Sequence, residues 1–431
     1  MSRREFAQSA CGSAAALLVF NQVYGCGTTG AAQHDAAVDA GYDVTPDMLE
    51  DAQLATDALG GREFIFDVQV HAAAPKPPWT AADLCDGTPP GCISPLAFVR
   101  EIFVSSDTTV ACLSGVPSAR ETDPLAIEAR ARMKAIVDQL SGGPRLLIHA
   151  NVRPNGGARE LELMEQDARD FPVAAWKVYP SEGSWALDSD EVGQPFCAKA
   201  RALGIKVIAA HRGISGDSGR YSDFSSPRDL AAAAKSNPDL TFIAYHAGWE
   251  GRIAEDHAFD ANEANPAGMH RMIKAVLDNG LGVNGNVYAE LGSTWRNLMA
   301  SPQQAAHAIG KLLKYLGPDR IVWGTDCLFT GSPQEQIVAF RRFQIPEALQ
   351  EAHGYPALTE EIRRKIFGLN AARVYGVSAS AALKQITTDD ISREKLALAD
   401  DPESIPMPDR KHYGPRNRRE FLAMLKRPAL L

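Results

Sequence analysis

The sequence predicts an α/β chain whose main domain is a (β/α)8 TIM barrel. Between residues 63 and 377, short runs rich in β-branched and aromatic residues alternate eight times with amphipathic helical segments. This alternation favours parallel strand pairing, and eight such units are typical of a closed barrel. An open doubly wound sheet is the alternative, but the first strand is not followed by the Gly-rich phosphate turn of such sheets.

Each expected strand contains residues that fill a pleated, half-buried surface, such as Val, Ile, Phe, Tyr or Trp. Two of the helical segments between them, SPRDLAAAAK and SPQQAAHAIGKLLKYLG, begin with Ser-Pro, which places proline at the first helical position. The expected strands are EFIFDVQVH (63–71), TTVACLS (108–114), RLLIHANV (145–152), AAWKVYP (174–180), KVIAAHRG (206–213), TFIAYHAG (241–248), NVYAELGS (286–293) and RIVWGTDC (320–327).

Residues 1–26 are expected to be an export signal rather than part of the fold. MSRREF pairs Arg3 with Arg4 ahead of an apolar run, which resembles a twin-arginine signal. VYGC, ending at Cys26, resembles a lipobox, so a lipid anchor at Cys26 and cleavage elsewhere are both open. Residues 27–62 contain few large apolar side chains and are expected to be a flexible tether. We therefore expect a periplasmic protein or a membrane-anchored lipoprotein that faces the periplasm.

Residues 378–431 form a C-terminal extension beyond the barrel. Its basic segment, DRKHYGPRNRREFLAMLKR, is expected to pack on the barrel as a strap, with a membrane-surface helix and a role in homo-oligomerisation left open. The seven cysteines match no zinc motif, so free thiols are expected, with a disulfide loop in CDGTPPGC (85–92) as the alternative. A net charge of −9 gives nucleic-acid binding no support, so the expected partner is a small-molecule substrate.

Polar side chains end nearly every expected strand. In a (β/α)8 barrel the carboxyl ends of the strands form one rim, and active sites lie there. On the first strand, side-chain alternation is expected to place Asp67, Gln69 and His71 on one face, a costly arrangement unless a partner satisfies them. The rim residues are Gln69, His71, His149, Lys177, His211, His246, Glu290 and Asp326. Trp176 and Trp323 are expected to face the helices.

Imidazoles and a carboxylate from different strands are the ligands that a divalent metal ion needs. His71, His211 and Asp326 would give the three protein ligands that are typical of catalytic zinc. A metal-bound water has a pKa near 7, so hydroxide becomes available at neutral pH. His246 would lie beside this water or the substrate, where it could polarise a carbonyl or transfer a proton.

Other residues near the predicted mouth are candidates for substrate binding. Lys177 and Arg212 are cations that could hold a substrate carboxylate. Trp249, just beyond the sixth strand, could line the pocket. Glu290 is a further candidate at the rim, and a structural pair with Lys177 or Arg212 is its alternative role.

At these motifs the chain resembles the amidohydrolase superfamily, in the branch of aminocarboxymuconate-semialdehyde decarboxylase and related decarboxylases and hydrolases. The similar segments are FDVQVH, AAHRG, AYHAG, WGTDCLF and the closing KIFGLNAARVYGV. The resemblance implies one divalent metal, most often zinc and sometimes manganese, with His71, His211 and Asp326 as ligands and His246 near the substrate. The family's first strand normally ends Asp-x-His-x-His, whereas this chain has Gln69 at the first histidine position, either as a ligand or as a residue that orients metal-bound water.

The resemblance and the residues together predict an exported metal-dependent hydrolase of an amide, ester or lactone bond in a small carboxylate-bearing substrate. Asp326 would accept the proton of the attacking water, and His246 would polarise the electrophile. Non-oxidative decarboxylation of an aromatic or unsaturated carboxylic acid at the same site is the alternative. A metal-poor, non-catalytic binding protein is a further alternative, supported by Gln69 alone.

Overall fold

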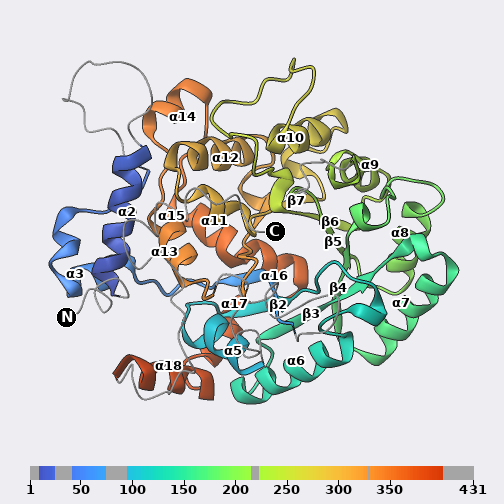
Figure 1. Ribbon diagram of the computed structural model, residues 1–431, viewed down its shortest axis with the longest axis horizontal. Coiled ribbons are helices and arrows are strands. Elements are labelled where there is room, and N and C mark those ends of the chain that lie inside the picture. Colours follow the sequence, from blue (N-terminus) through green and yellow to red (C-terminus); the bar gives the residue numbers. More distant parts are fainter. Residues whose placement is uncertain (1–8, 25–40, 74–94, 215–222, 329–330, 401–431) are drawn as a thin grey trace.

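A computed structural model describes most of the chain (Figure 1). Its sheet consists of eight parallel strands. The strands follow one another in the sheet in the order of the sequence. The described residues are 9–24, 41–73, 95–214, 223–328 and 331–400. The strands are β1 (Phe66–Val70), β2 (Val110–Leu113), β3 (Leu146–Val152), β4 (Val173–Val178), β5 (Val207–His211), β6 (Thr241–Tyr245), β7 (Val287–Glu290) and β8 (Ile321–Val322).

The sheet closes on itself because β1 also pairs with the segment that follows β8. The Val68 amide donates to the Trp323 carbonyl at 3.0 Å, and the Asp326 amide donates to the Gln69 carbonyl at 2.9 Å. Seven of the eight strands lie within their predicted ranges, β4 begins one residue before its range, and the predicted (β/α)8 barrel is confirmed. The open doubly wound sheet is excluded, since such a sheet has two unpaired edges.

Helices surround the strands in Figure 1, and their apolar faces pack on the outside of the barrel. Trp176 and Trp323 face this layer as predicted: the Trp323 ring lies 5.2 Å from that of Phe340 in α13. The helices are α5 (Pro95–Val99), α6 (Ile127–Ser141), α7 (Ala158–Asp170), α8 (Gly193–Ala202), α9 (Arg228–Ser236), α10 (Gly268–Asp278), α11 (Thr294–Leu298), α12 (Pro302–Tyr315), α13 (Gln334–Arg342), α14 (Glu347–His353), α15 (Glu360–Arg364) and α16 (Asn370–Tyr375).

The interior of the barrel is filled by a second apolar cluster. Val68, Ala209 and Ile243 belong to it and are fully buried. Tyr375, the last residue of α16, extends the cluster, with its ring 5.3 Å from that of Phe66 in β1. The barrel is thus a packed core rather than a channel, and its polar residues gather at the carboxyl ends of the strands.

The segment before β1 packs on the barrel instead of forming a tether throughout. The Tyr42 hydroxyl donates to the Met299 carbonyl at 2.5 Å. Asp51 caps the helix α3 (Ala52–Leu59), which buries Ala55 and Leu59. The prediction of a flexible tether over 27–62 is therefore wrong for residues 41–62, because apolar side chains one helical turn apart anchor even this polar segment.

Within the predicted export signal, residues 10–24 form a helix, α2 (Ala10–Tyr24). Its buried positions, Cys11, Ala14, Leu17 and Phe20, recur every third residue and lie on one helical face. Among the described residues, no helix is both long and apolar enough to span a lipid bilayer. Arg3, Arg4 and Cys26, on which the export prediction rests, lie outside the described residues.

The C-terminal extension packs on the barrel as far as it is described. It forms α17 (Ala379–Gln385) and α18 (Asp390–Asp400). A buried ion pair, 2.9 Å between the Arg145 guanidinium and the Asp389 carboxylate, ties it to the barrel beside β3. The basic segment of the extension and the CDGTPPGC loop lie outside the described residues. The four described cysteines, Cys11, Cys112, Cys197 and Cys327, are free and buried.

Candidate active site

A bulge in β1 brings its last polar residues to the mouth of the barrel. Asp67 pairs with Ala111 and Val70 with Leu113, so β1 holds one residue more than β2 over this stretch. Val68 faces the barrel interior and Gln69 follows it at the mouth. The prediction that Asp67 shares a face with Gln69 is therefore wrong. The Asp67 carboxylate instead accepts the Thr325 amide at 3.1 Å, and burial raises its pKa to about 7.

Three side chains from the two ends of the barrel domain converge at the mouth. The Gln69 amide nitrogen lies 2.9 Å from Asp326 Oδ1 and 3.3 Å from His71 Nε2. His71 Nε2 lies 2.9 Å from the same Asp326 oxygen. All three residues are buried. The three atoms form a nearly equilateral triangle, which we call the mouth triangle.

Neighbouring groups orient the mouth triangle. His71 Nδ1 lies 3.0 Å from the Ser114 carbonyl, so this nitrogen carries the proton and Nε2 faces Asp326. The Ser293 hydroxyl donates to Asp326 Oδ2. Burial alone would raise the pKa of Asp326, but the close His71 imidazole and the hydrogen bond from Ser293 hold it well below its usual value. Asp326 is therefore an ionised carboxylate with one oxygen in the triangle.

His211 and His246 lie next to each other beside the triangle, with ring centroids 4.7 Å apart. Burial lowers the pKa of both, that of His246 to about 4. His246 Nδ1 lies 2.7 Å from the Gly292 carbonyl and so carries the proton of the neutral ring. His211 Nδ1 is buried and has no hydrogen-bond partner in the described part of the chain. Both rings are neutral, the form in which imidazole binds metals.

Backbone strain gathers at these strand ends. His246, Ser293 and Asp326 all have positive φ angles, 70°, 54° and 60°. Non-glycine residues adopt this left-handed conformation at a cost, and it is found most often at functional sites. Glu290 helps to hold two of these turns, because its carboxylate accepts the His246 amide at 3.0 Å and the Gly292 amide at 2.5 Å.

The mouth triangle fits a divalent cation only if Gln69 is one of the ligands. Two ligand atoms about 2.1 Å from one cation and at right angles to each other are roughly 3 Å apart, like the edges of the triangle. The amide oxygen of Gln69 is buried without a partner, and a flip of the amide would put this oxygen in the triangle. The expected trio of His71, His211 and Asp326 is not assembled: among the described residues, no three His, Cys, Asp or Glu side chains form a metal-binding group.

Lys177 projects into the barrel below the mouth, as predicted from its strand position. Its ammonium lies 3.3 Å from the centroid of the Tyr245 ring and 4.9 Å from that of Tyr179. It has no hydrogen-bond acceptor among the described residues, and burial lowers its pKa to about 7. Glu290 is also fully buried, which raises its pKa to about 8. A side chain at Gly324 would collide with Glu290, since a Cβ there would lie 1.7 Å from its Oε1.

Arg212 does not point into the mouth. Its guanidinium donates to Asp229 of α9 at 2.7 Å and to the Phe224 carbonyl at 2.9 Å, and the residue is fully buried. The expected substrate-binding role of Arg212 is thus contradicted, because it follows His211 directly and alternation turns it toward the helices. Trp249 is buried beyond β6, and its indole N–H has no partner in the described chain.

Several residues of the site were not singled out from the sequence. Ser114 and Ser293 orient the triangle, and Tyr179 packs its ring 5.4 Å from that of His211. Tyr179 shares the inward parity of Lys177, so strand alternation could have found it. Ser293 lies in a turn, where the alternation of side chains along a strand makes no prediction.

A family model described as amidohydrolase matches residues 66–377, nearly the whole barrel. The chain belongs to the amidohydrolase family. The family's members are metal-dependent enzymes, and the resemblance seen in the strand-end motifs is confirmed. No curated protein matches the chain.

Three of the solved structures that match the chain do so at low sequence identity. An uncharacterised TIM-barrel protein from Bordetella bronchiseptica is 14% identical over 74% of this chain and 99% of that chain, with a TM-score of 0.44. A 2,6-dihydroxybenzoate decarboxylase is 16% identical over 73% of this chain and 98% of its own, with a TM-score of 0.42. A 5-carboxyvanillate decarboxylase from Novosphingobium aromaticivorans, complexed with manganese, is 11% identical over 73% and 96%, with a TM-score of 0.45.

Proposed function

We propose that this amidohydrolase-family chain is an exported metal-dependent hydrolase that cleaves an amide, ester or lactone bond in a small carboxylate-bearing substrate. The observation that carries the proposal is the mouth triangle of Gln69, His71 and Asp326, with edges of 2.9, 2.9 and 3.3 Å. These buried atoms are nitrogen and oxygen ligands of the kind that bind a divalent cation, and the orphaned His211 Nδ1 is the proposed further ligand.

The ligand set suits zinc, and manganese is the alternative. Gln69 Oε1, His71 Nε2 and Asp326 Oδ1 would hold the ion, and His211 would complete the site. A bound divalent ion would lower the pKa of a coordinated water to about 7 and polarise a substrate carbonyl. Burial lowers the pKa of His211, so its ring is already neutral and binding does not require its deprotonation.

Asp326 is the proposed proton acceptor for the attacking water. It is ionised, and Ser293 fixes its outer oxygen, so its orientation is set before the substrate arrives. His246 is proposed to accept a hydrogen bond or a proton at Nε2, because its Nδ1 proton is committed to the Gly292 carbonyl. This tautomer argues against the expectation that neutral His246 polarises the electrophile by donating a proton.

The test compares metal-loaded and chelated protein on a panel of lactones, esters, amides and aromatic acids. Acid release and CO₂ evolution are recorded in parallel, since they separate hydrolysis from decarboxylation. We expect acid release that depends on zinc or manganese and is abolished by Asp326→Asn, while Asp170→Asn, an exposed carboxylate of α7, leaves it unchanged. Evolution of CO₂ would make the chain a decarboxylase, and turnover that survives chelation would contradict both functions.

The export component rests on the sequence of the first residues, Arg3 and Arg4 followed by an apolar run. Fractionation of cells that express the full chain tests it. We expect a periplasmic or membrane-anchored product, and replacement of both arginines by lysine should retain the protein in the cytoplasm. A cytoplasmic pool of the unaltered chain would contradict export.

A further inference from the structure

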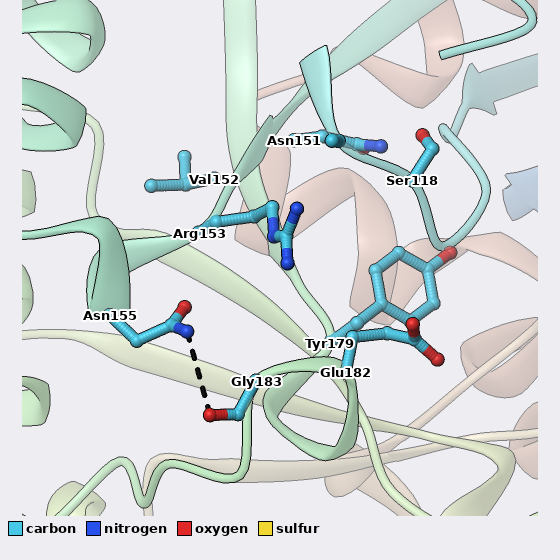
Figure 2. A pocket seen from close by; sticks show the side chains of 9 residues that line it. Ser118, Asn151, Val152, Arg153, Asn155, Tyr179, Glu182 and Gly183 are labelled. Atoms are coloured by element: carbon cyan, nitrogen blue, oxygen red, sulfur yellow. Dashed lines mark hydrogen bonds between the residues drawn. The ribbon is translucent and has the colours of Figure 1, made fainter. Parts of the chain in front are cut away.

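A pocket opens at the carboxyl ends of β3 and β4, and no residue of the mouth triangle lines it (Figure 2). It encloses about 400 Å³ of space, part of which is open to solvent. Its polar lining comes from Asn151 and Arg153 at the end of β3, Tyr179 and Glu182 after β4, and Ser118 after β2.

Strand alternation explains why these residues face the mouth. On β3 the inward positions run through His149 and Asn151 to Arg153, and β4 pairs with it so that Asn151 lies opposite Lys177. Tyr179 is the next inward position on β4. The inward residues that line the pocket therefore follow Lys177 toward the carboxyl ends of the strands.

Two charged side chains line this pocket: Arg153 is half-buried and Glu182 is exposed to solvent. Asn151 donates its amide N–H to the Val116 carbonyl at 2.9 Å, and its carbonyl oxygen is buried without a hydrogen bond. Arg153 and Glu182 both line the pocket, yet among the described residues neither side chain forms an ion pair. One cation and one carboxylate thus line the same space (Figure 2).

Tyr179 connects this pocket to the proposed metal site. The centroid of its ring lies 5.4 Å from the centroid of the His211 ring, and the residue also lines the pocket. Its hydroxyl donates to the Gly115 carbonyl at 2.6 Å, which fixes the ring in place. Tyr179 therefore lines the pocket and also packs against the His211 ring.

We propose that this pocket binds an α-amino carboxylate, the end of the substrate that is remote from the scissile bond. The Arg153 guanidinium is a planar fork of donors that suits a carboxylate, whereas the Glu182 carboxylate is an acceptor for an ammonium group. A ligand that carries an ammonium group and a carboxylate can pair with both Glu182 and Arg153. A simple carboxylate can pair with Arg153 alone. The proposal rests on the proposed hydrolase function, because it makes the substrate an amino acid whose side chain carries the bond to be hydrolysed.

The test measures binding of L-alanine, L-lactate and propionate by ligand-observed NMR, so it needs no turnover. Chelated protein is used alongside the metal-loaded form, because a ligand of the pocket should bind to both. We expect L-alanine to bind at least tenfold more tightly than propionate, with lactate between them, and Arg153→Met to weaken alanine binding about tenfold or more.

Arg159→Met is the matched control, since Arg159 is an exposed arginine at the start of α7 and does not line the pocket. Arg153→Lys keeps the charge but not the fork and should give an intermediate affinity. Equal binding of the three probes, or alanine binding unchanged by Arg153→Met, would overturn the proposal even if the enzyme proves metal-dependent. Alanine binding in the chelated form that requires Arg153 would support it even if the chain proves not to be a hydrolase.

Discussion

The side-chain amide of Gln69 lies 2.9 Å from the carboxylate of Asp326, although 257 positions separate the two residues in the sequence. Their backbones are also joined, since the Asp326 amide donates to the Gln69 carbonyl at 2.9 Å. The contact that closes the barrel is therefore the contact that builds the mouth triangle. Closure of the fold and assembly of the site are one structural event.

Gln69→Glu should tighten metal binding and destabilise the metal-free protein. The change puts a second buried carboxylate next to Asp326, and two like charges about 3 Å apart repel each other unless a cation lies between them. Thermal unfolding with and without zinc measures both effects: we expect a lower Tm in chelator and a larger rise on adding zinc. Gln69→Met, which has no oxygen ligand, should show the smallest rise. Equal zinc responses in all three proteins would mean that residue 69 is not a ligand.

Ser293→Ala should destabilise the metal-free protein at neutral pH by about 1 kcal/mol, the usual net value of one hydrogen bond. The pKa of Asp326 is lowered in the folded state, so its contribution to stability is present above the unfolded pKa near 4 and is lost as the pH falls. The difference between variant and parent should therefore shrink in acid. The loss occurs as the pH falls through the lowered folded pKa, so urea unfolding at pH 7 and at the lowest pH at which the protein stays folded, well below about 4, measures it. A difference that is independent of pH over this range would contradict the role of Ser293.

Lys177→Met should remove a rise in stability at alkaline pH. Burial lowers the pKa of Lys177 to about 7, so above that pH the unfolded chain holds more protons than the folded one until about pH 10. Stability of the parent should thus increase with pH across this window. The part above about pH 8 is the most informative, because Glu290 has titrated by then. Urea unfolding in this range should give a flatter profile for the variant, and identical profiles would place Lys177 outside the buried interior.

Asp389→Asn should loosen the C-terminal extension. The Asp389 carboxylate pairs with the buried Arg145 guanidinium and caps α18 through the Ser392 amide at 2.7 Å. Loss of one partner of a buried ion pair costs about 3 kcal/mol. Unfolding measurements should show this loss, and hydrogen exchange should rise in residues 379–400. Asp390→Asn, an exposed neighbour, is the control. Equal stability of the two variants would argue against docking of the extension through Arg145.

Much of the barrel could be predicted from the sequence because its signals are local. The run TFIAYHAG fills a pleated surface and ends in polar residues, and β6 lies within it. Several predicted strands overrun the observed ones at their carboxyl ends, as after β6, where His246 and Ala247 adopt left-handed conformations. Position at a strand end was also enough to place His71 and Asp326 at one rim.

The rest of the site depends on contacts that no local pattern encodes. The bulge in β1 arises from pairing with β2 and β8, and it separates Asp67 from Gln69 despite their spacing. The partnership of Ser293 with Asp326 joins two turns after different strands. Arg212 is the opposite case, since alternation after His211 predicts its outward direction and the substrate role assigned to it conflicts with that rule.

The most direct test is anomalous diffraction from crystals of the full chain grown with zinc or manganese. The account predicts one strong peak per chain at the mouth of the barrel, bonded to Gln69 Oε1, His71 Nε2 and Asp326, with His211 completing the site. A fully formed mouth triangle without a peak at millimolar metal, or a metal held elsewhere, would contradict it.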